Sequence, residues 1–137
     1  MLRLGRDHYL GMISHALDGL PEEACGLLAA TAPADGVEVR KTYPCRNRAA
    51  SARVYEVDSR DFLHADRDAE SEGLQIVGVY HSHTHTDAYP SPTDVRQAPD
   101  PEWHYLIVSL REPEPVVRSY RIVDGQVTEE PVVVDDQ

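Results

Sequence analysis

The stretch LQIVGVYHSH, residues 74–83, is the most strongly apolar run of this 137-residue chain and ends in two alternating histidines. An apolar run of this length, preceded by Gly73 and followed by a polar loop, predicts a buried strand. Side chains at positions i and i+2 of a strand point to the same face, so His81 and His83 should lie side by side. The stretch therefore predicts a central sheet that presents two imidazoles at one end.

Helices and further strands surround this central strand in the sequence. Periodicity and turn residues predict helices over residues 6–17, 59–72 and 91–98. They predict strands or extended segments over residues 24–30, 37–43, 53–57, 103–110, 116–123 and 127–134. Asp124-Gly125 is a tight-turn pair and predicts a β-hairpin at the C-terminal end. We therefore expect one domain, residues 1–137, of the α/β (α+β) class, with a mixed β-sheet and flanking helices.

Composition excludes several classes of protein. The 13 basic and 24 acidic residues give a formal charge of −11, which disfavours binding to nucleic acid. No apolar run approaches the ~18–20 residues that span a bilayer, and the first residues show no export signal, so we expect a cytoplasmic protein without membrane contact. Cys25 and Cys45 form no CxxC pair and are expected to be reduced and to be small buried or half-buried side chains. The oligomeric state stays open, a homodimer included.

The two histidines suggest a metal site with a third ligand further along the chain. Asp94 lies eleven residues after His83, in the first turn of the helix expected from Ser91. A catalytic zinc takes three protein ligands and leaves one position for water. Ser91-Pro92-Thr93-Asp94 is also a capping box with proline at the first helical position, so Ser91 and Asp94 could serve as helix caps alone. The joint pattern H-x-H-x7-S-x2-D favours the metal site.

A zinc hydrolase also needs a base that takes a proton from the attacking water. Glu23 is the candidate, because it opens the apolar stretch 24–30, where a carboxylate is costly unless it has a partner or a role. Taken alone, Glu23 and its neighbour Glu22 could equally be solvated. The chain lacks HExxH, so the helical arrangement of other zinc proteases is excluded.

The stretch EACGLL from Glu23, followed by His81-Ser82-His83 and Ser91-Pro92-Thr93-Asp94, resembles the JAMM, or MPN+, zinc metalloproteases. The resemblance implies their fold over nearly the whole chain. It also implies zinc held by His81, His83 and Asp94, with Glu23 as general base and Ser91 stabilising the tetrahedral intermediate. Many members have proline after the second histidine, where this chain has Thr84.

The runs HSHTHTDAYPSPTD and RSYRIVDGQVTEEPV resemble the small bacterial Mec-type peptidases of this family. This likeness implies hydrolysis of a Gly-Cys amide at the Gly-Gly tail of a ubiquitin-like sulfur carrier, CysO, in cysteine biosynthesis. The alternatives are isopeptidase or deubiquitinase-like cleavage of another ubiquitin-like conjugate and a non-catalytic binding module. The segment 53–57 is a candidate edge for pairing with the carrier tail, or an ordinary strand. The roles of His85, Cys25 and Cys45 stay open.

Overall fold

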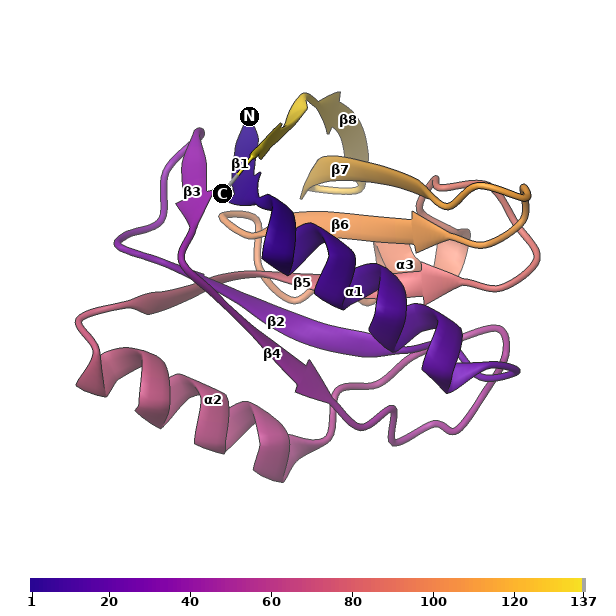
Figure 1. Cartoon of the computed structure of the whole chain (residues 1–137), viewed down its shortest axis with the longest axis horizontal. Coiled ribbons are helices and arrows are strands. Elements are labelled where there is room, and N and C mark those ends of the chain that lie inside the picture. The colour runs from indigo at the N-terminus through magenta and orange to yellow at the C-terminus, as the bar shows by residue number, and fades with distance from the viewer. Residues whose placement is uncertain (137) are drawn as a thin grey trace.

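The computed structural model describes residues 1–136, in which three helices accompany nine strands (Figure 1). The helices are α1 (Arg6–Gly19), α2 (Ser59–Ser71) and α3 (Pro92–Arg96). The strands are β1 (Leu2–Gly5), β2 (Cys25–Ala30), β3 (Val37–Val39), β4 (Lys41–Cys45), β5 (Gln75–His83), β6 (His104–Ser109), β7 (Val116–Val123), β8 (Gln126–Glu130) and β9 (Val132–Asp135). Within this range, no helix combines the length and apolarity needed to cross a membrane.

The main sheet has six strands in the order β4-β2-β5-β6-β7-β8. Strands β5 and β6 run parallel, whereas the other neighbours are antiparallel, so the predicted mixed sheet is confirmed. The hairpin of β7 and β8 is confirmed as well. Its two turn residues, Asp124 and Gly125, have φ angles of 51° and 77°, which are the left-handed values that a two-residue hairpin turn of this kind requires.

Two helices cover opposite faces of the main sheet. Leu27 of β2 belongs to the core that contains Ala69 of α2, whereas its neighbour Leu28 belongs to the core that contains Met12 of α1. Successive side chains of a strand alternate between faces, so a strand buried on both sides reads as the unbroken apolar run found here. Val79 of β5 lies in the α2 core, and the histidines two and four residues later therefore belong to that face.

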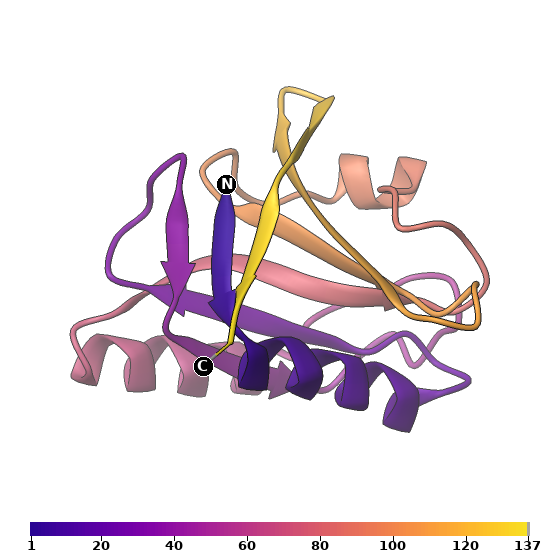
Figure 2. The same ribbon diagram turned by 45° about the horizontal axis from the view of Figure 1, so that its top comes forward.

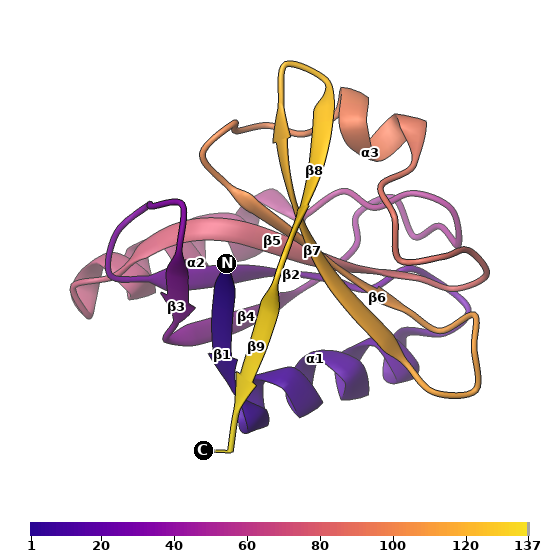
Figure 3. The same ribbon diagram turned by 90° about the horizontal axis from the view of Figure 1, so that it is seen from above.

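A second, smaller sheet was not predicted. Strand β1 lies between β3 and β9 and pairs with both in parallel (Figures 2 and 3). Leu2 and Leu4 are fully buried there, but a four-residue strand is too short for its alternation to stand out in the sequence. The predicted strand 37–43 divides at Arg40, which donates its N–H to Ala29 of the main sheet (2.8 Å). The predicted strand 127–134 divides at Pro131, which has no N–H for a ladder.

The expected strand at residues 53–57 is wrong. Within this segment only Val57 makes a bridge, to Asn47. The side-chain amide of Asn47 donates to the carbonyl of Val54 (3.1 Å) and accepts from the N–H of Glu56 (3.0 Å). The backbone of the segment is therefore bonded within its own loop and offers no free strand edge, so tail pairing at this segment is not retained.

A buried polar cluster joins strands β6, β7 and β8. The Nδ1 atom of His104 donates to Glu130 at 2.6 Å, and the hydroxyl of Ser119 donates to the same carboxylate oxygen at 2.8 Å. The Nε2 atom of His104 donates to the carbonyl of Ala34 at 2.9 Å. Burial opposes ionisation of Glu130, but its hydrogen bonds, above all that from His104, outweigh burial and lower its pKa from 4.5 to about 2.

This lowered pKa predicts how stability depends on pH. The contribution of ionised Glu130 to the free energy of unfolding is fully present above its unfolded pKa of 4.5 and is lost as the pH falls towards 2. We therefore expect the destabilisation by Glu130→Gln to be largest near neutral pH and to shrink below about pH 4, as measured by urea unfolding. Glu129→Gln, which removes a carboxylate that is 49% exposed, is the matched control. A Glu130→Gln penalty that is constant over this range would contradict the assignment.

Candidate metal centre and active site

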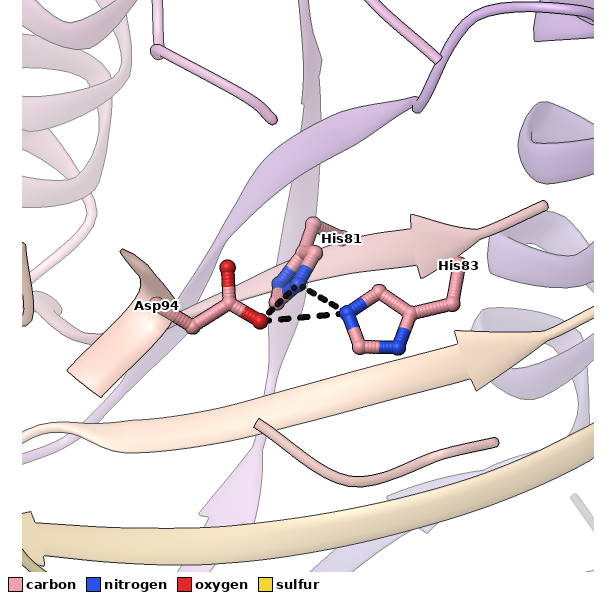
Figure 4. Close-up of side chains that lie close together, drawn as sticks. All are labelled: His81, His83 and Asp94. Carbon is pink, nitrogen blue, oxygen red and sulfur yellow. Dashed lines mark hydrogen bonds and ion pairs between the residues drawn. The ribbon is translucent and has the colours of Figure 1, made fainter. Parts of the chain in front are cut away.

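His81, His83 and Asp94 converge on one point although they come from two elements (Figure 4). The Nε2 atoms of His81 and His83 lie 3.1 Å apart. The Oδ2 atom of Asp94 lies 3.2 Å from the first of these nitrogens and 3.1 Å from the second. All three side chains are buried, and α3 places Asp94 against the end of β5. The structure thus brings together the three residues that the sequence singled out.

This triangle of atoms fits a metal ion. The Nδ1 atom of His83 donates to the carbonyl of Asp87 at 2.7 Å, so in the neutral ring Nε2 carries a lone pair. That lone pair, the second imidazole nitrogen and the carboxylate oxygen face one another with the spacing that ligands of one ion have. A tetrahedral site with bonds of ~2.0–2.1 Å has edges of ~3.3 Å, close to the distances observed. A buried divalent cation would relieve the mutual repulsion of these lone pairs.

The electrostatics of two candidate ligands, His81 and Asp94, agree with this interpretation, whereas in His83 the hydrogen bonds, above all that with Asp94, outweigh burial and raise the pKa. Burial lowers the pKa of His81, which favours the neutral imidazole that metals bind. Burial also disfavours the ionised form of Asp94, but the adjacent imidazoles of His81 and His83 and the N–H of Ser91 outweigh burial and hold the pKa of that carboxyl far below its usual range. The site therefore supplies one carboxylate and at least one neutral imidazole at neutral pH.

Glu23 is fixed through its backbone next to this triangle. The following residue, Ala24, accepts from the N–H of Ser82 (2.9 Å) and donates its own N–H to the Ser82 hydroxyl (2.8 Å). On the other side, Glu23 donates its N–H to the carbonyl of Ser51 (2.8 Å) and accepts from the side chain of Asn47 (3.0 Å). The glutamate is thus held between strand β5 and the loop of residues 46–57.

The carboxyl group of Glu23 differs sharply from that of its neighbour. Glu23 is 4% exposed and its Oε1 atom has no hydrogen-bond partner among residues 1–136, whereas Glu22 is exposed. Burial raises the pKa of Glu23 to about 8, with His83 lowering and Asp94 raising it. A cation in the triangle would favour the ionised form. A buried, unpartnered carboxyl group whose pKa depends on the charges of His83 and Asp94 is suited to proton transfer.

Ser91 forms the capping box that its sequence predicts. Its hydroxyl oxygen accepts from the N–H of Asp94 at 3.0 Å, and its own N–H donates to Oδ2 of Asp94 at 2.9 Å. The two interpretations of the motif are therefore compatible. The cap orients the Asp94 carboxylate towards the histidines, and the hydroxyl proton of Ser91 remains free to donate elsewhere.

Sequence reasoning missed three residues that support the site. Tyr55 stacks on the imidazole of His81, with ring centroids 4.2 Å apart and planes at 21°. Asn47 and Ser82 hold the backbone of Glu23 and Ala24, as described above. Each of these contacts joins segments that are far apart in the chain, and the only local signal is the position of Ser82 between the two histidines.

Neither cysteine is suited to act as a nucleophile. Cys25 and Cys45 are opposite each other on β2 and β4, and both are buried free thiols, as expected. Burial raises the pKa of each thiol to about 12, so neither forms a thiolate readily. His85 is exposed in the loop after β5 and is not among the three converging ligands.

The comparisons with known proteins agree with the fold. The family model of prokaryotic homologs of the JAB domain matches residues 5–123. The chain therefore belongs to this JAB-domain family.

Individual relatives carry the names of peptidases. The chain is 46% identical over 127 residues to the CysO-cysteine peptidase of Mycobacterium tuberculosis, with 92% of this chain and 86% of the relative covered. It is 39% identical over 113 residues to the desampylase of Haloferax volcanii, with 79% and 80% covered. The solution structure of protein DSY2949 from Desulfitobacterium hafniense is 38% identical and superposes with a TM-score of 0.92, covering 100% of this chain and 94% of that one.

The candidate ligands predict the effect of removing one of them. His83→Ala should lose most of the bound divalent metal, because two protein ligands rarely hold an ion in a catalytic site. Metal content after dialysis, measured by mass spectrometry, checks this. His85→Ala removes an exposed imidazole two residues away and should retain the metal. Full metal occupancy in His83→Ala would overturn the ligand assignment.

Proposed function

We propose that this protein is a cytoplasmic zinc peptidase that hydrolyses the C-terminal Gly–Cys amide of a ubiquitin-like sulfur carrier and releases cysteine for cysteine biosynthesis. The observation that carries the proposal is the buried carboxyl group of Glu23 held beside the His81, His83 and Asp94 triangle. The substrate class is supported by the 46% identity to a CysO-cysteine peptidase over 92% of the chain.

The candidate ligands, Glu23 and Ser91 have different roles in amide hydrolysis. Zinc held by His81, His83 and Asp94 would supply a Lewis acid for the scissile carbonyl and an acidified water. Glu23 accepts the proton of the attacking water and delivers it to the leaving amine as the C–N bond breaks. The hydroxyl of Ser91 donates to the developing oxyanion while its oxygen continues to cap α3.

A groove beside the site supports an extended tail as substrate. Its volume is about 580 Å³, and its lining includes Tyr55, Val57, Phe62 and Trp103. Tyr55 lines this groove and also stacks on His81, so the groove adjoins the candidate metal centre. Apolar side chains of a carrier tail would bind in this groove, while the thin Gly-Gly end enters the site. The formal charge of −11 is compatible with a basic carrier surface.

A second candidate is isopeptide cleavage of a different ubiquitin-like conjugate. The 39% identity to a desampylase favours it. Both candidates use the same residues and differ in the ubiquitin-like carrier and in the group that leaves. A non-catalytic binding module is disfavoured, because the three candidate ligands and Glu23 are all present and buried.

Mass spectrometry of a carrier–cysteine adduct tests the proposed substrate. Incubation of CysO carrying a C-terminal cysteine with the zinc-loaded protein should lower the carrier mass by one cysteine residue and release free cysteine. A chelator should abolish the reaction. A carrier that remains at full adduct mass would overturn the substrate assignment, and cleavage of an isopeptide-linked conjugate by the same preparation would support the second candidate.

A pair of glutamate variants tests the base. Glu23→Gln should retain fold and metal but lose at least ~10²-fold in rate, because a general base contributes about that much or more. Glu22→Gln is the matched control, since it changes an exposed carboxylate one residue away and should be nearly neutral. Initial rates on the adduct and metal analysis of both variants provide the measurement. The reverse order of effects would show that the wrong carboxylate was chosen.

A further inference from the structure

We propose that Arg53, assisted by His85, forms a subsite for the free α-carboxylate of the residue that leaves as the amine. This inference rests on the proposed function and names what selects its leaving group. Such a subsite would make the protein selective for a C-terminal amino acid over the side-chain amine of a lysine.

The segment that carries Arg53 lies directly beside the catalytic residues. The carbonyl of Ser51 accepts the backbone N–H of Glu23 at 2.8 Å. The next carbonyl, that of Ala52, accepts the hydroxyl of Thr84 at 3.2 Å. The Ser51 hydroxyl in turn accepts the N–H of Arg53 at 3.0 Å and fixes the turn from which this side chain extends. Arg53 is therefore anchored between Glu23 and the residue that follows His83.

Proton delivery by Glu23 places the leaving amine on the side of the site where Arg53 is anchored. Because Glu23 delivers the proton to the leaving amine, that nitrogen must lie on the Glu23 side of the scissile bond. In a C-terminal amino acid the α-carboxylate is only one carbon atom from this nitrogen. A long cationic side chain that starts beside the backbone of Glu23 is therefore suited to bind it. A lysine ε-amine has no carboxylate at that position.

The charge of this loop departs from that of the rest of the chain. The loop of residues 46–57 contains three arginines and one acidic residue, Glu56, in a chain of formal charge −11. Arg53 is exposed, and its guanidinium forms no ion pair within residues 1–136. A guanidinium that is free of internal partners is available for bidentate binding of a carboxylate.

His85 follows Thr84, which donates its hydroxyl to the carbonyl of Ala52 next to Arg53. It follows Thr84 as Arg53 follows Ala52, so the hydrogen bond between Thr84 and Ala52 brings these two exposed basic residues into the same region. A ring N–H of His85 can donate to a carboxylate in either charge state. This gives the exposed histidine of the loop a role in substrate binding rather than in the metal centre.

Two versions of one substrate test the subsite. CysO is prepared with a C-terminal cysteine that bears either a free carboxylate or a carboxamide, and kcat/KM is measured with zinc-loaded protein. The wild type should prefer the carboxylate by about tenfold or more, as a charge-assisted hydrogen bond allows. Arg53→Gln should lower the rate on the carboxylate to that on the carboxamide and leave the carboxamide rate unchanged. Arg53→Lys should retain part of the preference.

Arg48→Gln is the matched control, because it removes an exposed arginine from the same loop and should preserve the preference. Equal hydrolysis of both adducts by the wild type would overturn the subsite and leave the proposed function intact. A loss of rate on both adducts in Arg53→Gln would also overturn it, since Arg53 would then act by holding the loop. Hydrolysis of neither adduct by the wild type would overturn the proposed function and the subsite together.

Discussion

Two hydrogen bonds between Ala24 and Ser82 fix the geometry on which the site depends. They join the start of β2 to β5 between the two histidines, and they register Cys25 opposite His81. Glu23 precedes Ala24 and is thereby held at a set position relative to both imidazoles. A shift of one residue in this pairing would turn every side chain of β2 to the other face, so the base and the candidate ligands depend on one register.

The loop of residues 46–57 completes this arrangement from the side opposite β5. Asn47 and Ser51 bond to the backbone of Glu23, and Tyr55 covers the ring of His81. The loop therefore restrains the base and shields a candidate ligand from water. Exclusion of water disfavours an ionised carboxyl group, which explains why burial dominates the pKa of Glu23. The same loop lines the neighbouring groove, so substrate binding and base positioning depend on one segment.

The buried polar cluster around His104 and the candidate active site lie at different ends of the main sheet. The cluster of His104, Ser119 and Glu130 satisfies its buried polar atoms and ties the last three strands of the main sheet together. At the other end of the sheet, Oε1 of Glu23 and Nδ1 of His81 are buried without a partner among residues 1–136, and Nε of Arg121 on β7 is the third such atom. An unsatisfied buried group costs free energy, so the unpartnered carboxyl oxygen of Glu23 is expected to lie where an attacking water or a substrate supplies the missing contact.

The sequence by itself determined the central strand, the mixed sheet, the final hairpin and the three candidate ligands. These features depend on local periodicity and on short spacings, as in His81-Ser82-His83 and the capping box of Ser91 and Asp94. It put forward Glu23 rather than Glu22 from the start of the apolar stretch and the family resemblance, but only the pairing of β2 with β5 shows that Glu23 is buried. The small sheet around β1 and the true conformation of residues 53–57 were likewise decided by tertiary structure. Their hydrogen bonds join segments far apart in the chain, and such partners leave no periodic signal along it.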